Sequence, residues 1–168
     1  ITGSYGKTSV KNVLYQLMKE DWYALATPQS YNNRMGITKT ILEYLQPLHE
    51  LFLCEMGADH VHEIEELMKF VRPQYGIVTA VGQQHLATFH SMENILHEKM
   101  QMIEQLGRQG IGFLNADNEW IRSYPLRVYC RVIWFGKDML ADYRYGNVSY
   151  DEEGSRFTIT HKAVAHVF

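Results

Sequence analysis

The chain has 168 residues, of which 46% are apolar and 21% are charged. These values are average for globular proteins and exclude a disordered, collagen-like or fibrous chain, and the length suits one domain with a full core. Sixteen basic against nineteen acidic residues give a net charge of −3, so no basic excess indicates a nucleic-acid partner or an anionic membrane.

The cysteines and the apolar segments indicate a cellular setting. Cys54 and Cys130 both lie in apolar runs, as is typical of buried, reduced thiols in a cytosolic protein. The sequence has no signal peptide and no apolar stretch near the ~18 residues of a membrane span. We therefore expect a cytoplasmic protein without membrane insertion. Because the chain opens at Ile1 without an initiator methionine, we interpret it as a segment of a longer protein.

Helical and strand-like patterns alternate along the chain. Apolar residues at helical spacing predict helices over residues 10–18, 37–45, 62–71 and 91–106. Apolar runs predict strands over residues 22–27, 51–54, 75–81, 111–114 and 128–135. The alternation predicts an α/β fold with a mostly parallel sheet. Segments 143–150 and 156–161, joined by an acidic turn, predict a small antiparallel hairpin at the sheet edge.

The strongest motif is the glycine loop at residues 3–9, Gly-Ser-Tyr-Gly-Lys-Thr-Ser. Glycines let backbone N–H groups turn inward around phosphates, and the helix that follows points its positive end at the same anion. Lys7 would neutralise phosphate charge, and the Thr8 hydroxyl would bind Mg²⁺. The general pattern carries a glycine where Ile1 stands, so this loop is a shorter variant, and a glycine turn that merely caps a helix is the alternative. The residues predicted to bind ATP are Gly3, Ser4, Gly6, Lys7, Thr8 and Ser9.

A carboxylate and a histidine follow predicted strands. Glu55 ends the run 51–54, which puts it at the carboxyl edge of a parallel sheet, where ligands bind. It is a candidate for Mg²⁺, with a solvated strand end as the alternative. His85 follows the strand 75–81 on the same edge, although a single loop histidine is more often structural. His60 and His62 face different ways and lack a third ligand, so we interpret them as structural.

Five motifs, in order, resemble the Mur ligases, which add amino acids or peptides to a cell-wall precursor. The glycine loop is similar to their ATP loop. Segments 31–37, 55–64, 84–89 and 114–118 resemble motifs of the branch that adds D-alanyl-D-alanine. The match thins after about Trp120, and Arg34, Ala87 and Thr88 differ from the residues that the family often carries.

The resemblance implies a reaction and its cofactors. It implies an ATP- and Mg²⁺-dependent amide ligase that adds D-Ala-D-Ala to UDP-MurNAc-tripeptide through an acyl phosphate. It also implies that Lys99, fourteen residues after His85, is carbamylated by CO₂ to give an anion that ligates Mg²⁺. For a lysine within a helix, a solvated charge is the alternative.

The residue roles implied by the resemblance fall into three groups. The implied catalytic residues are Lys7, His85 and Lys99. The implied metal ligands are Thr8, Glu55, His85 and Lys99. The implied substrate contacts are Asn32 and Asn33.

The resemblance also implies a domain plan. Residues 1–168 would be the central ATP-binding domain of a bacterial enzyme, with a three-layer P-loop-like ATPase fold. This domain would be incomplete and inactive by itself, and it would lie between an N-terminal domain that binds the UDP-sugar and a C-terminal domain that closes over ATP. Two alternatives stay open: another Mur or folylpolyglutamate-type ligase, and a non-catalytic P-loop nucleotide-binding module. ATP hydrolysis that does not depend on an amine would indicate the module.

Overall fold

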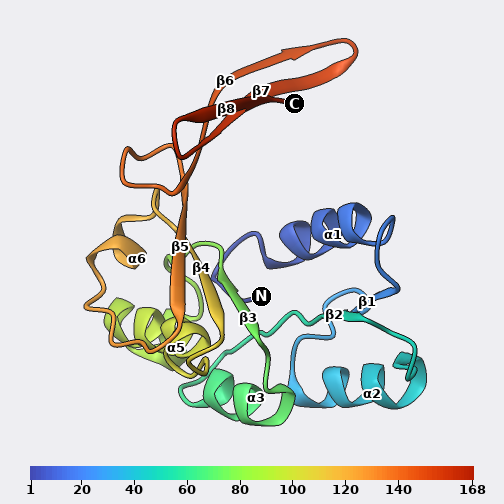
Figure 1. Cartoon of the computed structure of the whole chain (residues 1–168). Coiled ribbons are helices and arrows are strands. Elements are labelled where there is room, and N and C mark those ends of the chain that lie inside the picture. Colours follow the sequence, from blue (N-terminus) through green and yellow to red (C-terminus); the bar gives the residue numbers. More distant parts are fainter.

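A computed structural model describes residues 1–168 as a mixed α/β fold with helices on both sides of the strands (Figure 1). The elements in chain order are α1 (Lys7–Met18), β1 (Ala24–Ala26), α2 (Arg34–Tyr44), β2 (Leu51–Leu53), α3 (Glu63–Val71), β3 (Tyr75–Val78), α4 (Leu86–Phe89), α5 (Met92–Glu104), β4 (Ile111–Asn115), α6 (Glu119–Ser123), β5 (Arg131–Gly136), β6 (Tyr143–Asp151), β7 (Gly154–His161) and β8 (Val164–Val167). No helix combines the length and the apolarity needed to cross a membrane.

The strands form two groups that the first residues of the chain join. Strands β1 and β2 pair in parallel, and β3 to β8 form a sheet that is parallel as far as β6 and antiparallel beyond it. The Thr2 amide donates to the Ile77 carbonyl at 2.8 Å, and the Met56 amide donates to the Ile1 carbonyl at 2.9 Å. Ile1 and Thr2 therefore act as a short strand between β2 and β3, and this strand leads directly into the glycine loop.

The main core lies where α3 and α5 pack against β3 and β4. Its members include Ile64, Ile95, Met100, Ile103 and Leu114, each completely buried. A Cβ atom at Gly112 of β4 would lie 2.8 Å from the Ile103 side chain, so the glycine lets α5 approach the sheet closely. This packing fixes the rotation of α5 about its axis, and so directs Glu98 and Lys99 toward the segment between β2 and α3.

The predicted elements are confirmed, with shifts at their ends. The mostly parallel sheet and the C-terminal hairpin both occur, and Ser91 caps α5 by accepting a hydrogen bond from the Asn94 amide at 3.1 Å. The strand predicted over 128–135 begins only at Arg131. Three short elements, α4, α6 and β8, were not predicted, because four or five residues show too little periodicity.

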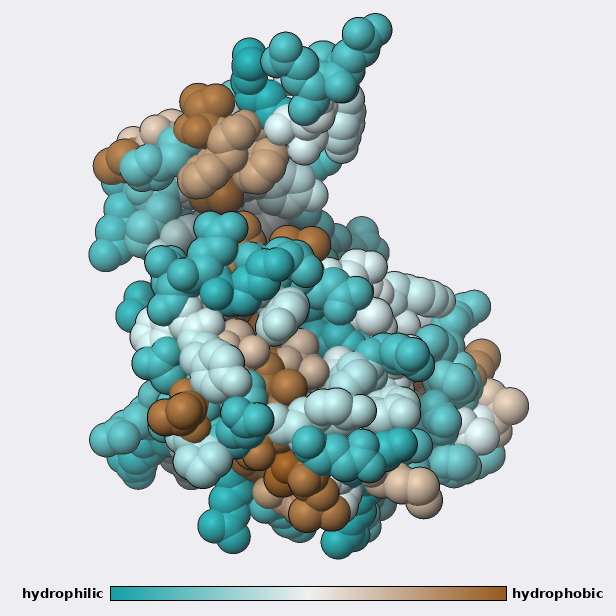
Figure 2. All heavy atoms as spheres, turned by 90° about the vertical axis from the view of Figure 1, so that its right-hand side faces the viewer, coloured by the Kyte–Doolittle hydropathy of each residue, from teal (hydrophilic) through white to brown (hydrophobic).

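The C-terminal strands β6, β7 and β8 project away from the helices (Figure 1). Figure 2 shows apolar atoms gathered on this projecting part. Large apolar side chains that stay exposed there include Tyr150, Val164, Val167 and Phe168. The projecting strands therefore add little to the main core, which is built from the preceding elements.

Helix α3 is capped by a side chain from α5. Its own N-cap residue, His62, makes no capping side-chain bond. Instead the buried Glu98 carboxylate accepts hydrogen bonds from the His62 amide at 2.7 Å and from the Ile64 amide at 2.6 Å. A carboxylate at this end of a helix also interacts favourably with the helix dipole. Glu98 therefore fixes the start of α3 relative to α5.

Replacing Glu98 with alanine should lower the free energy of unfolding by on the order of 2–4 kcal/mol, because two amides lose a buried charged acceptor. The free energy of unfolding of Glu98→Gln, which keeps one acceptor oxygen, should lie between the values of Glu98→Ala and the wild type. Urea unfolding measures the effect. Glu93→Ala on the exposed side of the same helix is the control, and an equal loss in the control would contradict the capping role.

Candidate functional site

The glycine loop is held firmly against the end of β3. Gly3 and Gly6 have φ angles of 148° and 78°, values that favour glycine. A Cβ atom at Gly3 would lie 2.2 Å from the Thr79 hydroxyl oxygen. The Ser4 amide donates to the Ala80 carbonyl at 2.7 Å, and the Ser4 hydroxyl donates to the Gly82 carbonyl at 3.0 Å. The loop thus leads directly into α1, with Gly6 as the N-cap residue, and the positive end of the helix dipole points toward the loop.

Three polar residues of the motif follow Gly6 in the first turn of α1. The Lys7 ammonium donates to the Gly3 carbonyl at 2.8 Å and so lies over the loop. Burial lowers the pKa of Lys7 below its ordinary value, while Glu55 and Asp59 act in the opposite direction. Thr8 is partly buried on the side of Glu55, whereas Ser9 is exposed.

Glu55 lies at the centre of a buried polar network. Its amide donates to the Thr27 hydroxyl at 3.1 Å, and its Oε1 accepts from the Asn32 side chain at 3.0 Å. Its Oε2 lies 3.1 Å from the Lys11 ammonium. Burial raises the pKa of Glu55, but hydrogen bonding from Asn32, Lys11 and Thr8 outweighs burial, so the net shift is downward. The carboxylate is therefore ionised, and it is not the solvated strand end of the alternative interpretation.

Glu55 and Thr8 suit a divalent cation that also binds phosphate. Oε2 of Glu55 is buried and is paired with the Lys11 ammonium at 3.1 Å, which leaves lone pairs for a further cation. Hard cations such as Mg²⁺ bind one or two protein oxygens together with phosphate oxygens. No three His, Cys, Asp or Glu side chains converge on one point. Protein residues alone thus form no complete metal cage, and the donor set fits a cation shared with a nucleotide.

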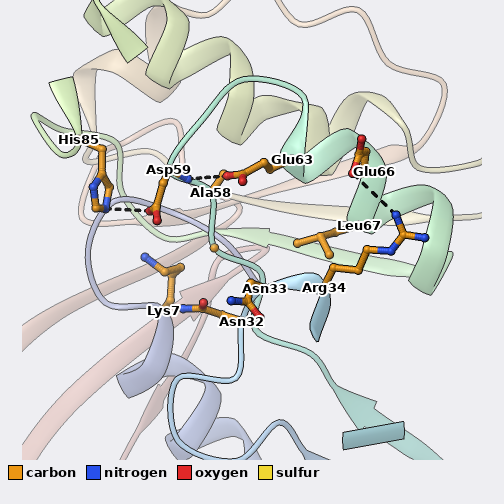
Figure 3. A pocket seen from close by; sticks show the side chains of 11 residues that line it. Lys7, Asn32, Asn33, Arg34, Ala58, Asp59, Glu63, Glu66, Leu67 and His85 are labelled. Carbon is orange, nitrogen blue, oxygen red and sulfur yellow. Dashed lines mark hydrogen bonds and ion pairs between the residues drawn. The ribbon is translucent and has the colours of Figure 1, made fainter. Parts of the chain in front are cut away.

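A polar cavity of about 240 Å³ opens beside the loop (Figure 3). Its walls come from the first turn of α1, the start of α2, the turn after β2, helix α3 and the loop after β3. The lining residues are Lys7, Asn32, Asn33, Arg34, Gly57, Ala58, Asp59, Glu63, Glu66, Leu67 and His85. The cavity thus brings together segments far apart in the sequence, all at the edge of the sheet where ligands bind in α/β folds.

The two asparagines predicted to contact substrate already have structural partners. The Asn32 side chain donates to Glu55, and the Asn33 side chain caps α2 by accepting from the Gly36 amide at 2.9 Å. Both line the cavity, so contact with substrate stays a prediction. The structure adds that Asn32 orients the Glu55 carboxylate.

His85 is paired with Asp59, a residue for which the sequence motifs predicted no role. The His85 Nε2 atom lies 3.1 Å from Asp59 Oδ1, and both side chains are partly exposed at the cavity (Figure 3). The Asp59 amide is itself held by Glu63 Oε2 at 2.7 Å. Among the predicted ligands, Thr8 thus adjoins Glu55, whereas His85 is paired with Asp59.

Lys99 is buried rather than solvated, so the solvated-charge alternative is wrong. Its side chain is 1% exposed. Its ammonium donates to the Ala58 carbonyl at 3.0 Å and lies 5.4 Å from the centre of the Phe89 ring. Burial, with the nearby Lys7 charge, lowers the pKa of Lys99 to about 8. The amine thus lies directly behind the turn that carries Asp59.

The sequence matches the family model described as Mur ligase middle domain over residues 1–167. The chain belongs to this Mur ligase family. It is 34% identical to UDP-N-acetylmuramoyl-tripeptide–D-alanyl-D-alanine ligase of Mycobacterium bovis over 99% of this chain and 33% of that protein. It is 30% identical to the ligase of the same name from Escherichia coli over 95% of this chain and 35% of that protein.

The fold agrees with this family assignment. The crystal structure of MurF ligase from Thermotoga maritima in complex with ADP superposes with a TM-score of 0.89 at 28% identity, covering 99% of this chain and 38% of that one. The chain therefore spans about a third of the length of the curated relatives it matches. The match to the family model extends past Trp120, although the sequence motifs end before that residue.

The pKa of Lys99 predicts a pH dependence of stability. Below about pH 8 the folded protein holds a buried charged amine; between pH 8 and the ordinary value of 10.5 only the unfolded chain keeps that proton. The free energy of unfolding should therefore rise with pH across this window, by roughly 2–4 kcal/mol in total. Urea unfolding at several pH values gives the free energy of unfolding of the wild type and of Lys99→Met. The difference between the two at each pH is the contribution of Lys99. A difference that stays flat with pH would contradict the assignment.

Proposed function

We propose that this chain is the nucleotide-binding part of an ATP-dependent ligase that joins D-Ala-D-Ala to UDP-MurNAc-tripeptide in bacterial cell-wall synthesis. The observation that carries the proposal is the glycine loop, which opens α1 beside the buried Glu55 and borders the polar cavity. The names of the relatives at 30% identity or more favour this substrate pair over that of a folylpolyglutamate-type ligase.

The loop residues would bind ATP by complementing its phosphates. Gly6 and Ser9, with the N-terminus of α1, would place backbone N–H groups around them. Gly3 and Ser4 would hold the loop in place, because the Ser4 amide and hydroxyl are bonded to the Ala80 and Gly82 carbonyls. The Lys7 ammonium would leave the Gly3 carbonyl and meet the charge on the transferred phosphoryl group. Thr8 and Glu55 would hold Mg²⁺, which when bound neutralises phosphate charge. The mouth of the cavity beside Lys7 is where the peptide carboxylate would lie.

The reaction that this arrangement suits has two transfers. The peptide carboxylate oxygen attacks the γ-phosphorus of ATP, which gives an acyl phosphate and ADP. The amine of D-Ala-D-Ala then attacks the acyl carbon, loses a proton and displaces phosphate. The chain contributes position and charge rather than a covalent bond.

We propose further that Lys99 is carbamylated. A neutral amine attacks CO₂ to form an N–C bond and releases one proton, and a pKa of about 8 leaves a large neutral fraction at mildly alkaline pH. The resulting anion would lie behind Ala58 and Asp59, on the side of the cavity where His85 lies. Together with His85, it would supply oxygen and nitrogen ligands for a second Mg²⁺.

In the full-length ligase, Lys7→Ala should lower the rate of acyl-phosphate formation by at least about a hundredfold, because the transferred phosphoryl group loses its cation. The measurement is ADP release in the presence and absence of D-Ala-D-Ala. Lys19→Ala, an exposed lysine at the other end of the same helix, is the matched control. Near-wild-type turnover in Lys7→Ala would overturn the phosphate-loop assignment, and turnover that ignores D-Ala-D-Ala would favour a binding or hydrolytic module.

Carbon-13 NMR of the full-length ligase in labelled bicarbonate should show a protein carbamate resonance that is lost in Lys99→Met and kept in Lys39→Met, an exposed lysine of α2. The signal should grow as the pH is raised through about 8, because the amine must be neutral to react. An active wild-type enzyme without such a resonance would mean that Lys99 acts as a buried ammonium group.

A further inference from the structure

Lys11 is a buried cation that the proposed chemistry has not used. It lies on α1, one helical turn after Lys7, and its side chain is 1% exposed. Its ammonium donates a hydrogen bond to the Gln29 carbonyl and lies 3.1 Å from Glu55 Oε2. Lysine is rarely buried unless it is paired. The Lys11 ammonium is paired here with the Gln29 carbonyl oxygen and with Glu55 Oε2, which belong to two other segments.

The position of Lys11 bears directly on the candidate Mg²⁺ site. Lys11 faces Oε2 of Glu55, which lies 3.1 Å from the ammonium. Oε1 is already held by Asn32. A metal ion at Glu55 would therefore share Oε2 with the ammonium or displace it. Because the Lys11–Glu55 pair is neutral, a second cation gains little attraction from it alone.

We infer that Lys11 is a positioning residue that makes divalent-cation binding at Thr8 and Glu55 depend on nucleotide. Without nucleotide, the ammonium balances the carboxylate and fixes its direction. When nucleotide phosphates enter the glycine loop, they add the negative charge that a hard, strongly hydrated cation needs before it gives up water. The inference rests on the proposed function, because it takes the glycine loop as the phosphate site.

The arrangement also explains why a lysine suits this position. A buried ion pair adds little net stability compared with apolar residues of similar size, because both charges lose water. An apolar residue at position 11 would pack in the same space but would leave Glu55 as an unpaired buried charge. That carboxylate would attract any divalent cation, with or without nucleotide.

The test measures Mn²⁺ binding to the full-length ligase by electron paramagnetic resonance, with and without ADP. The wild type should bind Mn²⁺ at this site only with ADP. Lys11→Gln, which removes the charge and keeps a hydrogen-bond donor, should bind Mn²⁺ without ADP at least about tenfold more tightly than the wild type. Lys39→Gln is the control for general loss of positive charge, and Lys11→Gln combined with Glu55→Gln should abolish the gain.

Each outcome discriminates. A folded Lys11→Gln variant with unchanged Mn²⁺ affinity in the absence of ADP overturns the inference and leaves the proposed function standing. A wild type that binds no Mn²⁺ even with ADP overturns the proposed phosphate and metal site, and this inference with it. If substitutions at position 11 do not fold, the wild type still decides, because equally tight Mn²⁺ binding with and without ADP contradicts the role of Lys11.

Discussion

The ionised carboxylate of Glu55 is the buried charge around which the site is arranged. A charge removed from water is costly unless other groups pair with it. Two segments supply those groups, α1 through Lys11 and the loop before α2 through Asn32. The Thr27 hydroxyl at the end of β1 accepts from the Glu55 amide and fixes the backbone that carries the charge. Glu55, which follows β2, therefore links three parts of the site: helix α1, the end of β1 and the cavity wall that carries Asn32.

A second constraint holds the opposite wall. Helix α5 turns two adjacent charged residues, Glu98 and Lys99, inward toward the segment between β2 and α3. Glu98 binds the amides at the start of α3, and Lys99 binds the Ala58 carbonyl. The segment that carries Asp59 is therefore anchored at both ends by the same helix. Because α5 is itself packed into the core, the site inherits the rigidity of that core.

Glu55 and Lys99 are both charged groups buried in the fold, and their burial shapes the pKa of each. Burial keeps the Lys99 amine close to neutrality near pH 8, whereas a solvated lysine would stay protonated and unreactive toward CO₂. The network around Glu55 acts in the opposite sense and keeps the carboxylate charged despite burial. One edge of the sheet thus holds a buried amine with a lowered pKa and a carboxylate that stays charged.

The sequence by itself determined the features that depend on nearby residues. Apolar spacing, the glycines before Lys7 and the apolar run before Glu55 are local patterns, so the elements, the loop and the sheet edge followed from them. Tertiary structure decided which charges are buried and which residue each one meets. Lys11 and Lys99 read as ordinary helix lysines, and their burial depends on partners in distant segments. Glu98 and Asp59 gained their roles in the same way, because a helix N-terminus and a histidine meet them only after α5 and the loop after β3 pack together.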